Sequence, residues 1–118
     1  MKLNHLNLVV TNVTKTVAFF ETYFGFTCTL VKGDDVIAIL KGGDDFTLVI
    51  MTTKENIHYP KAFHLGFMMD TIEKVDELYE KLKRGNISVD VPREIRDSYG
   101  FYFHFDSIMI EVGHYLTA

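Results

Sequence analysis

The sequence predicts an α+β fold built from two copies of one βαβββ module. The first observation is a repeat, because the segment 5–26 (HLNLVVTNVTKTVAFFETYFGF) aligns with the segment 64–85 (HLGFMMDTIEKVDELYEKLKRG). Each copy begins His-Leu, continues as an apolar run, meets a polar cap and then adopts helical spacing. The second observation is that strand-like runs follow each helix. Two copies are too few for a solenoid, so we expect two similar halves related by a pseudo-twofold.

In the first copy, Thr11 or Asn12 caps a helix that ends at Gly25. Its apolar positions at helical spacing are Val13, Val17, Phe20 and Phe24. The runs TCTLVKG, VIAILKG and FTLVIMTT follow as expected strands, and the turns GDD and GGDD separate them.

In the second copy, Asp70 or Thr71 caps the helix and Gly85 ends it. The expected buried stripe is Ile72, Val75, Leu78 and Leu82. The expected strands after it are ISVDV (87–91), GFYFHF (100–105) and SIMIEVG (107–113).

Length and composition predict one globular domain of 118 residues, with module one at 1–52, a connecting loop at 53–60 and module two at 61–118. The net charge is −4 and the charges are interspersed, so no basic stripe predicts a nucleic-acid partner. Cys28 is the single cysteine, which is typical of a reducing cytoplasm. No apolar run approaches the roughly 18 residues of a membrane span.

The alternation of strand side chains places three unusual polar residues on equivalent faces. In the first, fifth and last strands, one face is uniformly bulky and apolar, as a helix-packing face should be. The other face carries smaller or polar residues, and His5, His64 and Glu111 lie there. A carboxylate among apolar neighbours is costly unless it is paired or metal-bound. We therefore treat the three as one candidate site, against the alternative of a metal-free pocket in which Glu111 hydrogen-bonds the histidines.

The last hairpin adds neighbours to this candidate site. If Asp106-Ser107 is a two-residue turn, Tyr102 lies opposite Glu111 and His104 lies opposite Met109. Both residues would then face the same cavity and could act in acid–base catalysis, although they could also be aromatic residues that line the core. A slip of one residue would reverse this assignment.

These features resemble the vicinal oxygen chelate superfamily, which includes glyoxalase I, fosfomycin-resistance proteins, extradiol dioxygenases and bleomycin-resistance proteins. Paired βαβββ modules, a His in the first strand of each module and a Glu in the terminal IEV carry the resemblance over essentially the whole chain. It implies mixed sheets that curve around an open cavity. Family members of this length usually form homodimers, often with each cavity built from both chains.

The resemblance also implies one divalent metal ion per site, held by His5, His64 and Glu111. Two imidazoles and one carboxylate leave coordination positions open for water or substrate, as in catalytic zinc sites or the facial triad of Fe(II) oxygenases. A substrate with two adjacent oxygens could chelate the ion, which would stabilise developing negative charge. Zn, Mn, Ni and Fe are all open as the metal.

The fourth strand departs from the family pattern. Metal-using members carry His or Glu there, whereas the matching position falls near Ile50, or at Leu48 or Thr52 with a shifted register. This disfavours a glyoxalase-I-like isomerase, which uses a fourth-strand Glu in proton transfer. We expect Ile50 to contact the substrate, together with Asn7 and Met109.

The favoured function is a metal-dependent lyase, isomerase or thiol transferase acting on a small oxygen-rich molecule, as glyoxalases and antibiotic-resistance enzymes do. One alternative is a metal-free protein that sequesters a drug or metabolite, although such proteins lack metal ligands. A second is a small extradiol dioxygenase, which is disfavoured because such enzymes usually have four modules. No sequence feature favours or disfavours a third, a regulatory or immunity-type binding partner.

Overall fold

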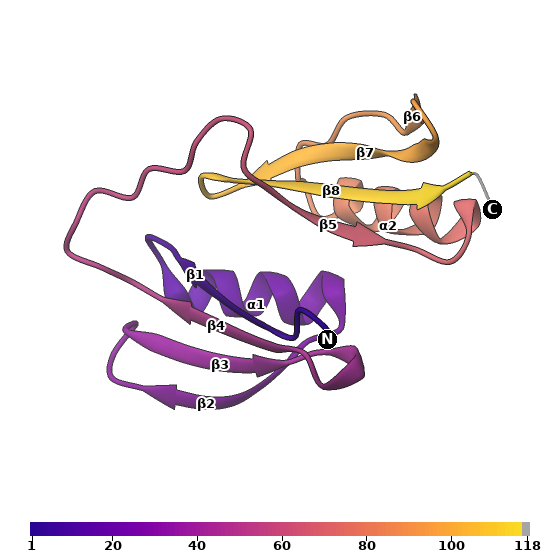
Figure 1. Ribbon diagram of the computed structural model, residues 1–118. Helices are drawn as coiled ribbons and strands as arrows, with labels where there is room; N and C mark the ends of the chain where they lie inside the picture. Colours follow the sequence, from indigo (N-terminus) through magenta and orange to yellow (C-terminus); the bar gives the residue numbers. More distant parts are fainter. Residues whose placement is uncertain (117–118) are drawn as a thin grey trace. The chain divides into compact units, whose positions relative to one another are not determined.

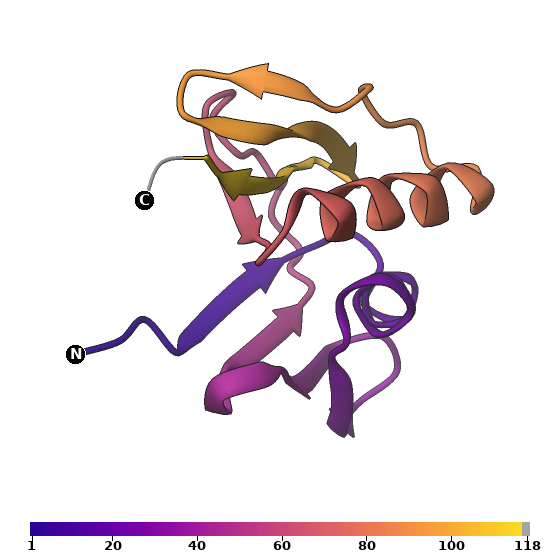
Figure 2. The same ribbon diagram turned by 90° about the vertical axis from the view of Figure 1, so that its right-hand side faces the viewer.

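The computed structural model describes residues 1–116, which form two compact units. The first unit is Met1–His58, and the second begins at Tyr59. In each unit one helix packs on one face of a four-stranded sheet and leaves the other face open (Figures 1 and 2). Within the described residues, no helix has the length and apolar character needed to cross a membrane.

The first unit contains one helix, four strands and a short 3-10 turn. Its elements are β1 (His5–Val9), α1 (Val13–Phe24), β2 (Thr27–Lys32), β3 (Ile37–Lys41), the turn Gly43–Asp45 and β4 (Thr47–Met51). The order of strands in the sheet is β1-β4-β3-β2, with β1 parallel to β4 and the other pairs antiparallel.

The second unit repeats this topology. Its elements are β5 (His64–Met68), α2 (Ile72–Arg84), β6 (Arg93–Ile95), β7 (Ser98–Phe105) and β8 (Ile108–Tyr115). The order is β5-β8-β7-β6, with β5 parallel to β8. The predicted α+β class with two βαβββ modules is therefore confirmed.

Both helices begin and end where the sequence predicts. Asn12 caps α1, since its side-chain oxygen accepts a hydrogen bond from the Lys15 amide at 2.9 Å. Thr71 caps α2 by accepting from the Lys74 amide at 3.2 Å. Gly25 ends α1 in the left-handed region, at φ 71°, where a residue with a Cβ is disfavoured.

The core of each unit lies between helix and sheet. In α2 the predicted stripe is buried at Val75, Leu78 and Leu82, whereas Ile72 in the first turn is partly exposed. In α1 the buried face is rotated from the predicted one and consists of Val13, Thr16, Phe19 and Phe20. Thr16 is tolerated there because its hydroxyl donates to the Asn12 carbonyl at 2.8 Å.

The prediction of a regular strand at 87–91 is wrong. That segment makes a single bridge, between Val89 and Phe103, and the regular strand is β6 at Arg93–Ile95. Pro92 separates the two stretches and has no N–H to donate to a ladder. Arg96 then adopts φ 56° and turns the chain tightly, so that β6 pairs with the start of β7.

Gly100 of β7 is required by the close approach of β8. A Cβ built at Gly100 would overlap the carbonyl oxygen of Val112, because the two strands lie side by side there. We expect Gly100→Ala to lower the free energy of unfolding by about 2 kcal/mol, because the backbone must move to accommodate the methyl group.

Urea unfolding measures this change. Gly43→Ala is the control, since an added Cβ at Gly43 meets nothing within 4 Å and should change stability by less than about 0.5 kcal/mol. Equal stability of the two variants would show that the strands can separate at no cost.

Candidate metal-binding and catalytic site

The register of the second sheet brings together the residues that the sequence singled out in module two. Tyr102 lies opposite Glu111 and His104 opposite Met109, across the Asp106-Ser107 turn. This confirms the predicted hairpin. On its other side β8 pairs with β5, where Gly66 lies opposite Glu111 and His64 opposite Met109. Paired side chains share a face, so all of these lie on the face that α2 leaves open.

His64 and Glu111 are in direct contact. The distance from His64 Nε2 to Glu111 Oε1 is 3.3 Å, and the side chains keep 39% and 21% of their surface accessible. His64 Nδ1 lies 3.0 Å from the carbonyl oxygen of Ala62. A carbonyl can only accept, so Nδ1 carries a proton and donates it. In the neutral imidazole, Nε2 therefore carries no proton, and its lone pair faces a carboxylate oxygen. This contact is favourable only when a proton or a cation lies between the two atoms.

Tyr102 completes a cluster around Glu111. Its ring packs edge-to-face against the His64 imidazole, with 5.9 Å between ring centroids. Burial raises the pKa of the Tyr102 hydroxyl, and the charge and hydrogen bonding of Glu111 raise it further. The charges of Arg96 and Arg93 act in the opposite direction. A protonated Tyr102 hydroxyl can donate to the Glu111 carboxylate.

The donor set fits part of a metal site. A neutral imidazole nitrogen and a carboxylate oxygen are ligands for Zn, Mn, Ni and Fe, and the Nδ1 hydrogen bond is of the kind that orients ligating histidines. Gly66 leaves the space beside Glu111 unfilled, since an added Cβ would come to 3.8 Å from Oε1. Within residues 59–116, no third His, Cys, Asp or Glu joins the pair. A complete site needs a further ligand.

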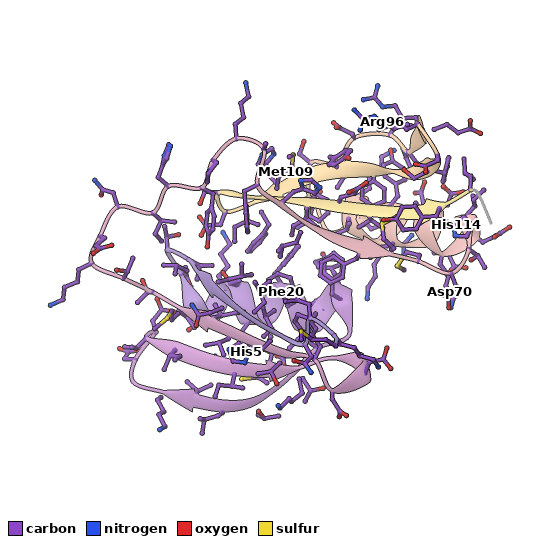
Figure 3. The ribbon with its side chains drawn as sticks, viewed as in Figure 1. His5, Phe20, Asp70, Arg96, Met109 and His114 are labelled. Atoms are coloured by element: carbon purple, nitrogen blue, oxygen red, sulfur yellow. The ribbon has the colours of Figure 1, made fainter. Side chains whose placement is uncertain are left out.

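His5, the third expected ligand, belongs to the first unit (Figure 3). It is exposed at the start of β1, opposite Thr47, and Asn7 is exposed on the same face, opposite Val49. The structure therefore unites two of the three expected ligands within one unit and shows His5 on the open face of the other unit's sheet.

Ile50 does not lie on that open face. It pairs with Leu8 and is fully buried between sheet and helix α1. The residue that corresponds to Glu111 is Val49, because Val49 pairs with Asn7 as Glu111 pairs with Gly66. The fourth-strand position that matches the family's ligand is therefore Val49 and not Ile50. Ile50 cannot reach a ligand on the open face. Val49 is no metal ligand either, so the departure from the family pattern stands.

A cavity of about 310 Å³ opens on the same face of the second sheet. Its lining residues are Ser88, Asp90, Tyr102, Phe103, His104 and Met109. Three of these residues, Tyr102, His104 and Met109, are among those that the sequence predicts near the site. Ser88 and Asp90 are not, although alternation about Val89 could have put both on the open face.

His114 is excluded from the cluster, as its place in β8 predicts. It lies opposite Tyr99, and its Nδ1 donates to the Met69 carbonyl at 2.9 Å. The Tyr99 hydroxyl donates to the Asp76 carboxylate of α2 at 2.6 Å. Figure 3 shows His114 toward the opposite end of β8 from Met109. The Tyr99–Asp76 hydrogen bond ties helix α2 to the sheet on the covered face.

Comparison with known proteins identifies the family. A model of the glyoxalase/bleomycin resistance protein/dioxygenase superfamily matches residues 2–110. The chain belongs to this superfamily. A possible glyoxalase from Bacillus cereus is 36% identical, with a TM-score of 0.84 over 95% of this chain and 97% of that one. No curated protein matches.

More distant structures share the fold alone. The fosfomycin resistance protein FosX from Listeria monocytogenes is 21% identical, with a TM-score of 0.80 over 97% of this chain and 93% of that one. Lactoylglutathione lyase from Agrobacterium tumefaciens is 19% identical, with a TM-score of 0.76 over 96% of this chain and 92% of that one. A FosX variant complexed with Mn(II) and 1S,2S-dihydroxypropylphosphonic acid is 22% identical, with a TM-score of 0.77 over 99% of this chain and 93% of that one.

The Tyr99–Asp76 contact predicts a loss of stability in strong alkali. The hydrogen bond to Asp76, followed by burial and the Asp76 charge, raises the pKa of Tyr99 from 10.0 to about 12. Below pH 10 the Tyr99 hydroxyl is protonated in both the folded and the unfolded state, so its hydrogen bond to Asp76 contributes fully to the free energy of unfolding. Between pH 10 and 12 the unfolded chain loses this proton first, so the free energy of unfolding falls.

Urea unfolding at pH 9, 10 and 11 measures this fall. Tyr99→Phe should be less stable than the wild type at pH 9 and should show a shallower decline between pH 10 and 11. If the free energy of unfolding of the variant falls as steeply as that of the wild type between pH 10 and 11, groups other than Tyr99 cause the loss of stability in alkali.

Proposed function

We propose that this chain is a metal-dependent enzyme of the vicinal oxygen chelate type that acts on a small, oxygen-rich molecule. The observation that carries the proposal is the 3.3 Å contact between His64 Nε2 and Glu111 Oε1 on an open sheet face. Two acceptors at this distance suit a shared cation. The reaction would be a lyase, isomerase or thiol-transfer reaction.

One divalent ion, Zn, Mn, Ni or Fe, would be held by His64 and Glu111, with His5 as the third ligand. His5 would come from the same chain or from the partner in a homodimer. The Mn(II) complex of the FosX variant supports a divalent ion in a related fold. Bound there, the ion would act as a Lewis acid toward a substrate that chelates it through two adjacent oxygens.

The chain's own residues have separable roles in this proposal. The hydrogen bond from His64 Nδ1 to Ala62 orients the imidazole, and Tyr102 orients the Glu111 carboxylate. Val49 in place of a fourth-strand carboxylate leaves no base on that strand, so His104 or Tyr102 would supply the acid–base group. Asn7 and Met109 would contact the substrate.

A metal-free binding protein is the second candidate function. The same contact favours it, because a protonated His64 would form an ion pair with Glu111 without any metal. The cavity would then sequester a small molecule rather than transform it.

Metal retention separates the two functions. We expect the purified full chain, loaded with Zn(II), Mn(II), Ni(II) or Fe(II), to keep about one equivalent of at least one of these ions after dialysis. His64→Ala and Glu111→Ala should each lower the affinity by more than about a hundredfold, because each removes a ligand rather than a residue that supports one. Elemental analysis measures the retained metal.

His58→Ala is the matched control, because it removes an exposed histidine outside the cluster and should keep the metal. A wild-type chain that retains none of the four ions would support the metal-free function. Equal retention in all three variants would place the metal elsewhere.

A further inference from the structure

The cavity beside the His64–Glu111 pair has a polar wall that the proposed metal chemistry does not use. We call its lining residues Tyr102, His104 and Met109 the floor, and Ser88 and Asp90 the wall. Phe103 also lines the cavity. At about 310 Å³ it is at the lower end of the range for small-molecule sites. It can therefore take a substituent of a few atoms from a substrate held at Glu111.

Backbone pairing fixes the position of this wall. Val89 bridges Phe103, whose side chain is buried on the helix side of the sheet. Neighbours in an extended chain point the opposite way, so Ser88 and Asp90 point to the open face. The Asp90 amide donates to the Tyr102 carbonyl at 3.2 Å, which holds the wall next to the floor.

The polar groups of the wall have no partners in the part of the chain that the structure describes. Within residues 1–116, the Asp90 carboxylate and the Ser88 hydroxyl make no hydrogen bond or ion pair with another residue. The His104 imidazole on the floor is free in the same sense within those residues. A carboxylate only accepts hydrogen bonds, so a ligand that satisfies Asp90 must donate one.

The charges of Arg93 and Arg96 reach the Tyr102 hydroxyl on the floor of the cavity and act to lower its pKa. Arg96 is at the turn between β6 and β7, whereas Met109, which pairs with His104, is at the other end of the β7–β8 hairpin (Figure 3). Neither Arg93 nor Arg96 lines the cavity. The lining residues include one carboxylate, that of Asp90.

We propose that this cavity is the specificity subsite for the end of the substrate farther from the ion, and that Asp90 selects a hydrogen-bond donor there, an ammonium or hydroxyl group. The inference rests on the proposed function, since the ion and Glu111 hold the other end of the substrate. It narrows the substrate to a small chelating molecule whose tail carries a donor rather than an acid.

Hydroxamates of matched length test the subsite, because each chelates an ion through two adjacent oxygens and differs only in its tail. The probes are β-alanine hydroxamate, with an ammonium tail, butyrohydroxamate, with a methyl tail, and succinic monohydroxamate, with a carboxylate tail. Calorimetric titration of the Mn(II)-loaded full chain should show the ammonium probe binding about fivefold tighter than the methyl probe, as for a partly exposed ion pair. The carboxylate probe should bind most weakly.

Asp90→Asn should abolish this preference and leave the binding of butyrohydroxamate unchanged. Glu94→Gln is the control, because it removes a carboxylate of the same unit that does not line the cavity, and it should keep the preference. A preference that survives Asp90→Asn, equal binding of the three probes, or tighter binding of the carboxylate probe would each overturn the proposal.

The metal-free chain separates this proposal from the proposed function. There the amide resonances of Ser88, Val89 and Asp90 should shift with millimolar β-alanine hydroxamate and not with butyrohydroxamate. That selective shift without any metal-dependent binding would contradict the metal enzyme and support the subsite. Metal-dependent binding of all three probes without the selective shift would contradict the subsite and support the metal enzyme.

Discussion

The contact between His64 and Glu111 is the constraint on which the functional account depends. With Nδ1 committed to the Ala62 carbonyl, the imidazole turns its other nitrogen toward a carboxylate. Neither atom can donate to the other unless a proton is added. The sheet therefore holds two acceptors together without a donor of its own between them, and the charge of the carboxylate raises the pKa of the neighbouring Tyr102.

The sheet beneath this pair is arranged to keep it in place. Parallel pairing of β5 with β8 puts His64 two pairs along from Glu111 and on the same face, and the glycine opposite Glu111 leaves room beside the carboxylate. The first unit has the same topology but different chemistry, with Asn7 and Val49 where the second has Gly66 and Glu111. One unit thus carries most of the polar cluster, and the other offers His5 on the open face of its sheet.

The sequence predicts the parts of this arrangement that local rules control. The repeat predicts two βαβββ modules, the caps predict both helices, and alternation predicts the shared face of Tyr102 and Glu111. The sequence does not predict which residues face the site where this depends on the pairing of strands that are distant in the chain. Ile50 and Val49 differ by one residue, and the register with β1 chooses between them. The strand after α2 is also misplaced, because Pro92 and the positive φ of Arg96 put it at 93–95, which no apolar pattern shows.

The central claim is that the His64–Glu111 pair binds a cation, and ¹⁵N NMR of the His64 imidazole tests it most directly. The metal-free chain should show a proton on Nδ1. Addition of one equivalent of Zn(II) at constant pH should shift the Nε2 resonance to that of a metal-bound nitrogen, while Nδ1 keeps its proton. An imidazole spectrum unchanged by Zn(II), Mn(II), Ni(II) and Fe(II), with a proton remaining on Nε2, would contradict the account and leave a metal-free ion pair in its place.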